Sequence, residues 1–209
     1  MRLIRSRKFL YLVKPKTAST SIRAALDEHA PEVIRWDNGE ECYHPNLSHV
    51  RGWLENRQDD LTLEDLTIAT SIRNPWSLMV SFFRHFQPDL SLRYSFDKNH
   101  DPDRLTTFHE WLVAMEGDPL HHNSPAFTSL DRFARDGEVE ASFIMRSENL
   151  RDELSRLSRL IALPFSQSEY VENVRAGGSH DYRRFFTTRT KNFVGDVFRA
   201  DVIAGNYSF

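Results

Sequence analysis

The chain has 209 residues, of which 40% are hydrophobic, and its formal net charge at pH 7 is −3. This length and composition are typical of one α/β domain with a sizeable core, so we expect a single domain over residues 1–209. A general nucleic-acid-binding protein is usually more basic, and we therefore expect no nucleic acid among the partners.

The cysteine and hydropathy patterns bear on the compartment. Cys42 is the only cysteine, which excludes an intrachain disulfide and suits a reducing environment. No stretch approaches the roughly 18 apolar residues that a membrane-spanning helix needs. The basic segment 1–8 is followed by an apolar run that is too short for a secretory signal. We expect a cytoplasmic protein without a membrane span.

The first predicted elements enclose a candidate anion-binding turn. A buried strand over 8–13 breaks at Pro15, and a helix follows over 20–30. The turn between them holds Lys16 and a run of small, mostly hydroxyl-bearing residues over 17–21. Backbone amides, the helix N-terminus and the lysine charge together favour a bound phosphate or sulfate group. The alternative interpretation is a capped helix start with a surface lysine.

This turn differs from an ATP-binding loop. The Walker motif needs G-x-x-x-x-G-K-[ST], with glycines that let the backbone wrap the phosphates. The turn here has no glycine, and Lys16 precedes the hydroxyl-bearing residues instead of following the loop.

A second strand-to-helix unit follows. A buried strand over 66–72 ends at Arg73, and Pro75 begins a helix over 75–86 that carries Ser81. An arginine fork and a hydroxyl suit a phosphate group, although the arginine could instead cap a helix and the serine could be a bystander. We expect both buried strands to lie side by side at the centre of a parallel sheet, with their turns at one edge.

The rest of the chain continues the alternation of helices and strands that is typical of an α/β fold with a central sheet flanked by helices. A long polar loop over 87–104 is of a length that is more often functional than not. The remaining predicted elements are a short segment at 33–36, a loop that becomes helical over 44–54, helices at 106–116 and 125–135, a strand at 141–146, a helix at 148–161, a loop at 164–180 and a terminal helix at 184–204.

The two turns resemble those of one enzyme family. Lys-Pro-Lys-Thr-Ala-Ser-Thr-Ser over 14–21 is similar to the 5′-phosphosulfate loop of sulfotransferases that use 3′-phosphoadenosine-5′-phosphosulfate (PAPS), and is closest to the carbohydrate branch with its heparan and chondroitin 2-O-type members. Arg73 and Ser81 match the family's ligands of the 3′-phosphate. More faintly, 143–150 and 201–209 resemble later family segments, the last with an extra asparagine and an alanine in place of a phenylalanine.

The resemblance implies a P-loop-NTPase-like sulfotransferase fold and a compact, bacterial-type member. It implies transfer of a sulfuryl group from PAPS to an acceptor hydroxyl, on a glycan or glycolipid, by in-line displacement without a required metal. Lys16 matches the family's catalytic lysine, which stabilises the leaving group, whereas Lys14 is expected to point elsewhere. The 5′ groups of the nucleotide would be bound by Lys16, Thr17, Ala18, Ser19, Thr20 and Ser21.

The general base is expected to be a histidine, because its ordinary pKa lies near working pH. His44 opens His-Pro-Asn-Leu-Ser-His-Val-Arg, which resembles the family segment that carries the base. His49 is the rival, and either residue could instead be a surface or capping histidine. The pair His121 and His122 is not expected to bind metal, because adjacent side chains point apart and no third ligand is suitably spaced.

The C-terminal region offers a further nucleotide contact. The family often returns a loop over the adenine and the 3′-phosphate, and Tyr182 and Arg183 match such a role here. An equally open interpretation is a helix entry with exposed arginines.

Two other functions compete with sulfuryl transfer. One is a small-molecule or nucleoside kinase on a related fold, against which the missing Walker glycines argue. The other is a non-catalytic nucleotide-binding or scaffold protein, against which the set of Lys16, Arg73, Ser81 and a candidate histidine argues. The region 87–129 is expected to shape the acceptor site.

Overall fold

The computed structural model describes residues 1–35, 46–57, 60–86, 107–117, 127–135, 138–164 and 182–209. Contacts divide the chain into two compact units. Unit 1 comprises Met1–Arg73 with Leu130–Ala176, and unit 2 comprises Asn74–Ser129 with Gly177–Phe209. The single domain expected over residues 1–209 stays a prediction.

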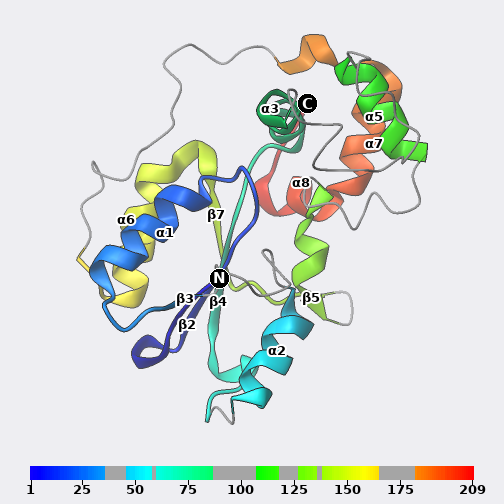
Figure 1. Cartoon of the computed structure of the whole chain (residues 1–209). Coiled ribbons are helices and arrows are strands. Elements are labelled where there is room, and N and C mark those ends of the chain that lie inside the picture. Colours follow the sequence, from blue (N-terminus) through cyan, green and yellow to red (C-terminus); the bar gives the residue numbers. More distant parts are fainter. Residues whose placement is uncertain (36–45, 58–59, 87–106, 118–126, 136–137, 165–181) are drawn as a thin grey trace. The chain divides into compact units, whose positions relative to one another are not determined.

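Unit 1 is built on a five-stranded sheet with the order β3-β1-β2-β4-β7 (Figure 1). The three strands β2, β4 and β7 pair in parallel, whereas β1 runs antiparallel to both β2 and β3. The α/β class is therefore confirmed. The prediction of a parallel sheet is correct only for β2, β4 and β7, because β1 makes the sheet mixed. Its strands are β1 (Arg2–Ile4), β2 (Phe9–Leu12), β3 (Ile34–Arg35), β4 (Thr67–Ile72) and β7 (Phe143–Arg146).

The strand β1 corrects the interpretation of the basic N-terminus, where no strand was expected. A 3₁₀ turn over Arg5–Arg7 and a left-handed Lys8, with φ 47°, fold the chain back so that β1 pairs with β2. Arg2 is buried, and its Nη2 donates to Asp27 Oδ2 at 2.8 Å. Pairing with this carboxylate allows a charged residue to occupy a buried strand.

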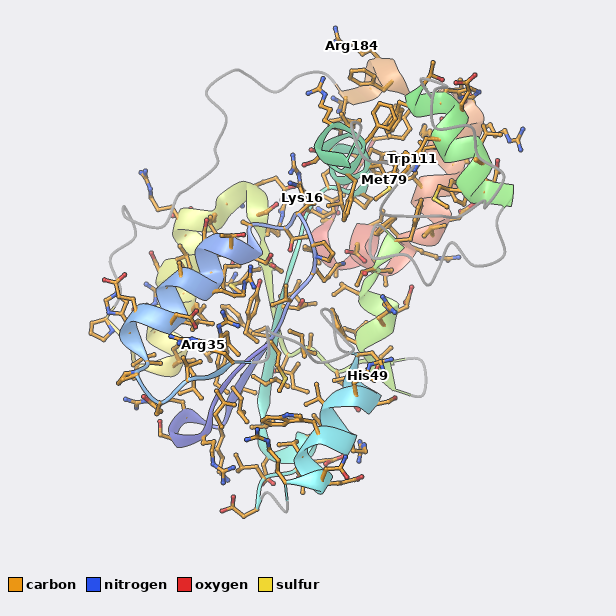
Figure 2. All side chains as sticks on the ribbon, viewed as in Figure 1. Lys16, Arg35, His49, Met79, Trp111 and Arg184 are labelled. Atoms are coloured by element: carbon orange, nitrogen blue, oxygen red, sulfur yellow. The ribbon has the colours of Figure 1, made fainter. Side chains whose placement is uncertain are left out.

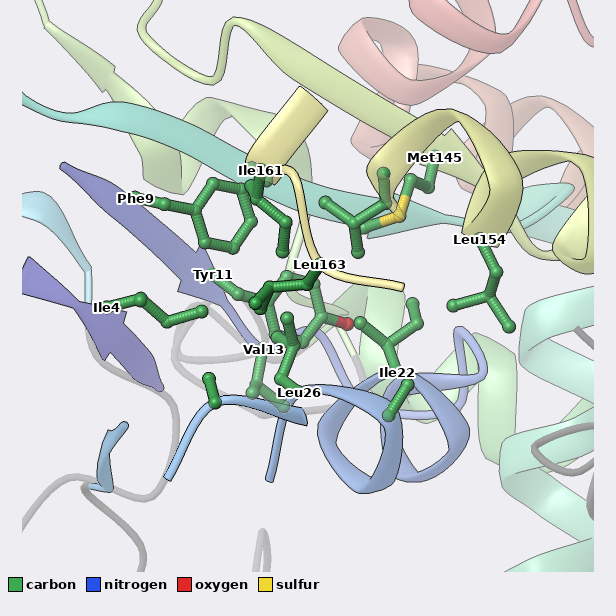
Figure 3. Packing of buried hydrophobic residues seen from close by; sticks show 14 of the residues in the cluster. Ile4, Phe9, Tyr11, Val13, Ile22, Leu26, Met145, Leu154, Ile161 and Leu163 are labelled. Atoms are coloured by element: carbon green, nitrogen blue, oxygen red, sulfur yellow. The ribbon is translucent and has the colours of Figure 1, made fainter. Parts of the chain in front are cut away.

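Two helices pack on one face of the sheet. These are α1 (Ser19–His29) and α6 (Leu150–Ile161), which lie side by side in Figure 1. Their apolar side chains form one buried cluster with Phe9, Tyr11 and Val13 of the β2 segment (Figure 3). The predicted helices over 20–30 and 148–161 are thereby confirmed within a few residues.

The opposite face of the sheet is buried as well. Leu10, Leu12, Ile68 and Ile72 point away from the first cluster by strand alternation, and all four are buried. The helix α2 (Leu47–Asn56) lies on this side in Figure 1. Burial on both faces explains why β2 is a continuous apolar run, and why the buried hydroxyls of Thr70 and Ser71 on β4 are hydrogen-bonded.

Unit 2 is a helical unit with an aromatic core. Trp76, Phe108, Phe127 and Phe198 are buried together, and the Phe108 and Phe186 rings meet edge to face with centroids 5.0 Å apart. Aromatic pairs in this arrangement contribute about 0.5–1.5 kcal/mol beyond their area burial. Its elements are α3 (Pro75–Phe86), α5 (Phe108–Gly117), the 3₁₀ helix η7 (Tyr182–Phe185), α7 (Thr188–Val197) and α8 (Arg199–Gly205).

Two predicted helices differ from the structure. The terminal helix over 184–204 is interrupted, because the Thr187 side chain caps a new helix by accepting from the Thr190 amide. In place of a helix at 125–135, the described part holds a 3₁₀ turn over Leu130–Phe133 and the strand β5 (Ala134–Arg135), which pairs with β6 (Glu138–Val139). The predicted loops at 87–104 and 164–180 lie almost wholly outside the described residues.

Candidate functional site

The turn between β2 and α1 has an unusual backbone. Lys16 and Ala18 both adopt left-handed conformations, with φ of 60° and 62°. Pro15 precedes Lys16, and a proline followed by a residue with positive φ is typical of a type II turn. Left-handed geometry costs a residue with a side chain about 1–2 kcal/mol. The loop therefore reaches without glycine a conformation that glycine usually supplies, and such strain is concentrated at functional sites. Figure 2 labels Lys16 at this turn.

A buried hydroxyl network holds this backbone in place. The Thr17 hydroxyl donates to the Lys14 carbonyl at 2.9 Å and lies 2.7 Å from Ser71 Oγ, which in turn lies 2.8 Å from Tyr11 Oη. All four residues are buried. The sequence predicted a role for Thr17 but missed Ser71 and Tyr11. The available signal was only a serine inside a mostly apolar strand, because its contacts with Tyr11 and Thr17 depend on the register between β2 and β4.

The N-terminus of α1 suits an anion. Its N-cap is Ala18, so no side chain caps it among the residues that the structure describes, and its first turn carries no acidic residue. The first amides of a helix lack partners within the helix and add positive potential. Of the predicted ligands in this turn, Ser19 and Ser21 are buried and Thr20 is exposed. Left-handed residues just before a helix N-terminus are also a feature of backbone anion nests.

The two lysines of the loop differ in their surroundings. Lys14 is fully buried at the end of β2, whereas Lys16 is half-buried. The expectation that the two side chains take different directions stays a prediction. The catalytic role of Lys16 stays a prediction.

The second predicted turn lies at the same edge of the sheet. β2 and β4 are adjacent and parallel, with Leu12 opposite Thr70, so the expected central pair of strands is confirmed. Arg73 follows the last residue of β4 directly and is half-buried. Unit 1 thus brings the Lys16 loop and Arg73 to the carboxyl ends of neighbouring strands, the edge where α/β folds bind ligands.

The other predicted nucleotide ligands belong to unit 2. Ser81 is half-buried on α3, and Tyr182 and Arg183 lie in η7. The Asn74 amide donates to Tyr182 Oη at 3.2 Å, and the Arg183 guanidinium lies 5.0 Å from the centroid of the Tyr182 ring. Tyr182 is half-buried and Arg183 is exposed in this short helix before α7, as the helix-entry interpretation expects, and their role as nucleotide ligands stays a prediction.

The histidines are only partly described. His44 lies outside the described residues, as do His121 and His122. His49 caps α2: its Nδ1 accepts from the Asn46 amide at 3.3 Å, while its own amide donates to Asn46 Oδ1 at 2.9 Å. A neutral imidazole that accepts at Nδ1 carries its proton on Nε2. The capping alternative thus holds for His49.

The described part of the chain shows neither a membrane-spanning helix nor a metal-type cluster. None of its helices is both long and apolar enough to cross a bilayer. In the same ranges, no three His, Cys, Asp or Glu side chains gather as metal ligands would. In comparisons of the chain with protein-family models, curated proteins and solved structures, nothing matched.

Proposed function

We propose that this protein transfers a sulfuryl group from PAPS to a hydroxyl of an acceptor, which we take to be a glycan or glycolipid. The observation that carries the proposal is the Lys16 loop. Its backbone combines two left-handed residues with an uncapped helix start, and Arg73 ends the adjacent parallel strand. A cradle of amides beside an arginine suits a ligand with anionic groups at two positions.

The residues of unit 1 fit the two charged ends of such a ligand. The loop over 14–18 and the first turn of α1, with Ser19 and Ser21, would hold the 5′-phosphosulfate. Arg73 would grip the 3′-phosphate with its planar fork. Ser81, Tyr182 and Arg183 are proposed as further nucleotide ligands on the strength of the sequence resemblance.

The proposed chemistry needs a cation at the leaving oxygen and a base at the acceptor. PAPS, when bound, supplies an activated sulfuryl group that passes to the acceptor oxygen. Lys16 would stabilise the negative charge that develops on the leaving phosphate oxygen. His44 would remove the proton of the acceptor hydroxyl, and its role is favoured by the capping function of His49. The single cysteine makes the cytoplasm the proposed compartment.

Calorimetry with defined nucleotides tests the proposal. We expect 3′-phosphoadenosine-5′-phosphate to bind at least about tenfold more tightly than ATP, because only the former carries the 3′-phosphate for Arg73. Arg73→Ala should remove this preference. Equal binding of the two nucleotides, or no binding of 3′-phosphoadenosine-5′-phosphate, would defeat the proposal, and tight binding of ATP with magnesium would favour a kinase.

Transfer of radiolabelled sulfate from PAPS to a panel of glycans, glycolipids and small alcohols tests catalysis directly. With a positive acceptor, Lys16→Ala and His44→Ala should each lower the rate, the latter by about 10²–10⁴-fold as expected for a lost general base. His49→Ala is the matched control and should retain the rate. Retained activity in His44→Ala together with lost activity in His49→Ala would reverse the assignment of the base.

A further inference from the structure

We infer that Ser71 is a positioning residue that fixes the shape of the Lys16 loop through Thr17. The nucleotide-binding part of this inference rests on the proposed function, whereas the structural part does not. Ser71 lies on β4, and its Oγ lies 2.7 Å from Thr17 Oγ1 in the loop that follows β2. It is therefore a side-chain link between the strand that ends at Arg73 and the loop that carries Lys16.

The register of the sheet brings the hydroxyl groups together. Tyr11 pairs with Ala69 across the parallel strands, so Ser71 stands two residues nearer the carboxyl edge on the same face. The Tyr11 ring packs in the cluster of Figure 3, and its hydroxyl spans this offset to reach Ser71 Oγ at 2.8 Å. Tyr11, Thr17 and Ser71 are all buried, so protein groups satisfy their hydroxyls.

Counting protons fixes the direction of the chain of hydrogen bonds. Each hydroxyl has one proton to donate, and a carbonyl can only accept. Thr17 gives its proton to the Lys14 carbonyl, so Ser71 must donate to Thr17. The Ser71 proton is then committed, so Tyr11 must donate to Ser71. The chain runs one way, from Tyr11 through Ser71 and Thr17 to the backbone, and bonds aligned in this way reinforce one another.

This chain ends at the strained part of the loop. Thr17 stands between Lys16 and Ala18, the two residues with positive φ. Strained backbone of this kind persists only where the surroundings over-determine it. Without the Ser71 hydroxyl, the Tyr11 proton loses its acceptor and Thr17 loses its donor. The loop would then populate its binding shape for a smaller fraction of the time, which weakens ligand binding in proportion.

The chain offers a matched control one residue away. Thr70 is equally buried on β4, and its Oγ1 donates to the Leu12 carbonyl at 2.8 Å. It lies on the opposite face of the sheet from Ser71 and has no part in the Thr17 network. Thr70→Val therefore removes a buried hydroxyl bond between the same two strands while it leaves the hydroxyl chain intact.

The first experiment needs no ligand. Amide hydrogen exchange is compared between the wild-type chain, Ser71→Ala and Thr70→Val. We expect faster exchange over residues 16–21 in Ser71→Ala alone, because only this variant loosens the loop. Equal exchange in all proteins, or the same acceleration in Thr70→Val, would overturn the inference.

The second experiment measures where affinity is lost. We expect Ser71→Ala to bind 3′-phosphoadenosine-5′-phosphate about tenfold more weakly, and adenosine 3′-monophosphate as well as the wild type does. Only the former ligand carries the 5′ group that the loop would hold. A general loss of stability would instead weaken the binding of both ligands. Ser71→Thr should restore the affinity, and Thr70→Val should keep it.

The outcomes separate the two claims. A wild-type chain that fails to bind 3′-phosphoadenosine-5′-phosphate defeats the proposed function, and the exchange comparison then still decides the role of Ser71. A wild type that binds, with Ser71→Ala binding equally well, defeats the inference alone. If Ser71→Ala does not fold, Tyr11→Phe serves in its place, since it removes only the first donor, and an affinity loss of about two- to threefold is expected. Unchanged affinity in that variant would contradict the inference.

Discussion

Tyr11 shows how burial sets the ionisation of a single residue. Its phenol is fully buried, and loss of hydration raises its pKa well above the ordinary value of about 10. The charges of Arg23 and Arg2 lower it again by less. The folded chain therefore keeps Tyr11 protonated where the unfolded chain ionises it, and protonation agrees with its role as a donor to Ser71.

This difference predicts a loss of stability at alkaline pH. Below about pH 10 both states hold the Tyr11 proton, so its contribution is fully present. As the pH rises above that value toward the raised pKa, only the unfolded state releases the proton, and the free energy of unfolding falls by up to about 1.4 kcal/mol per pH unit. Urea unfolding at pH 8 and pH 10.5 should show a smaller fall in Tyr11→Phe than in the wild type. Equal falls would contradict the assignment.

Ala18 predicts an unusual response to glycine. Because its φ is 62°, Ala18→Gly removes a penalty of about 1–2 kcal/mol and adds about 0.5–1 kcal/mol of chain entropy cost. Urea unfolding should therefore show a protein as stable as the wild type, or more stable by up to about 1.5 kcal/mol. Ala24→Gly, at an exposed position inside α1, is the control and should lose about 1 kcal/mol. Equal losses in both variants would show that the left-handed geometry is not a source of strain.

At the scale of elements, two glycines in helices should respond oppositely to alanine. Gly52 lies inside α2, where an added Cβ has open space, so Gly52→Ala should raise the free energy of unfolding by about 0.5–1 kcal/mol. Gly205 ends α8, where a Cβ would overlap the Tyr207 ring, so Gly205→Ala should lower it by about 1–3 kcal/mol. Thermal or urea unfolding measures both, and a stabilised Gly205→Ala would contradict the packing of Tyr207.

The elements that the sequence predicts best are those whose pattern is local and complete. Mostly apolar runs in the sequence predict β2 and β4, and Pro75 at the first turn predicts the helix over 75–86. β1 could not be predicted, because Arg2 becomes tolerable in a strand only through Asp27 of a distant helix. The break at Thr187 had a local signal in its capping pair with Thr190, which the periodic phenylalanines obscured.

The candidate site divides in the same way. Lys16, Thr17 and Arg73 can be named from the sequence, because their place at strand ends is a matter of chain order. Ser71 cannot, because its contact with Thr17 depends on the register between two strands that are far apart in sequence. Positive φ at Lys16 could not be predicted either, since a lysine gives no local signal for it.

At the scale of the whole molecule, each unit is assembled from two separate stretches of chain. Unit 1 needs residues 130–176, which supply β7 and α6. A chain ending at residue 129 would leave β4 as an open edge and remove the α6 leucines from the core. We expect this fragment to lack a cooperative urea transition that the full chain shows, as followed by circular dichroism. A cooperative transition in the fragment would show that β7 and α6 are dispensable.

The distance along the chain between Thr17 and Ser71 has a consequence for biosynthesis. The loop over 14–18 is synthesised before β4, so in the growing chain it exists before Ser71 can contact it. Until β4 pairs with β2, the growing chain has the sequence of the loop but lacks the Ser71 contact that holds its backbone. The proposed ligand cradle would thus form only after two strands that are far apart in the sequence have paired.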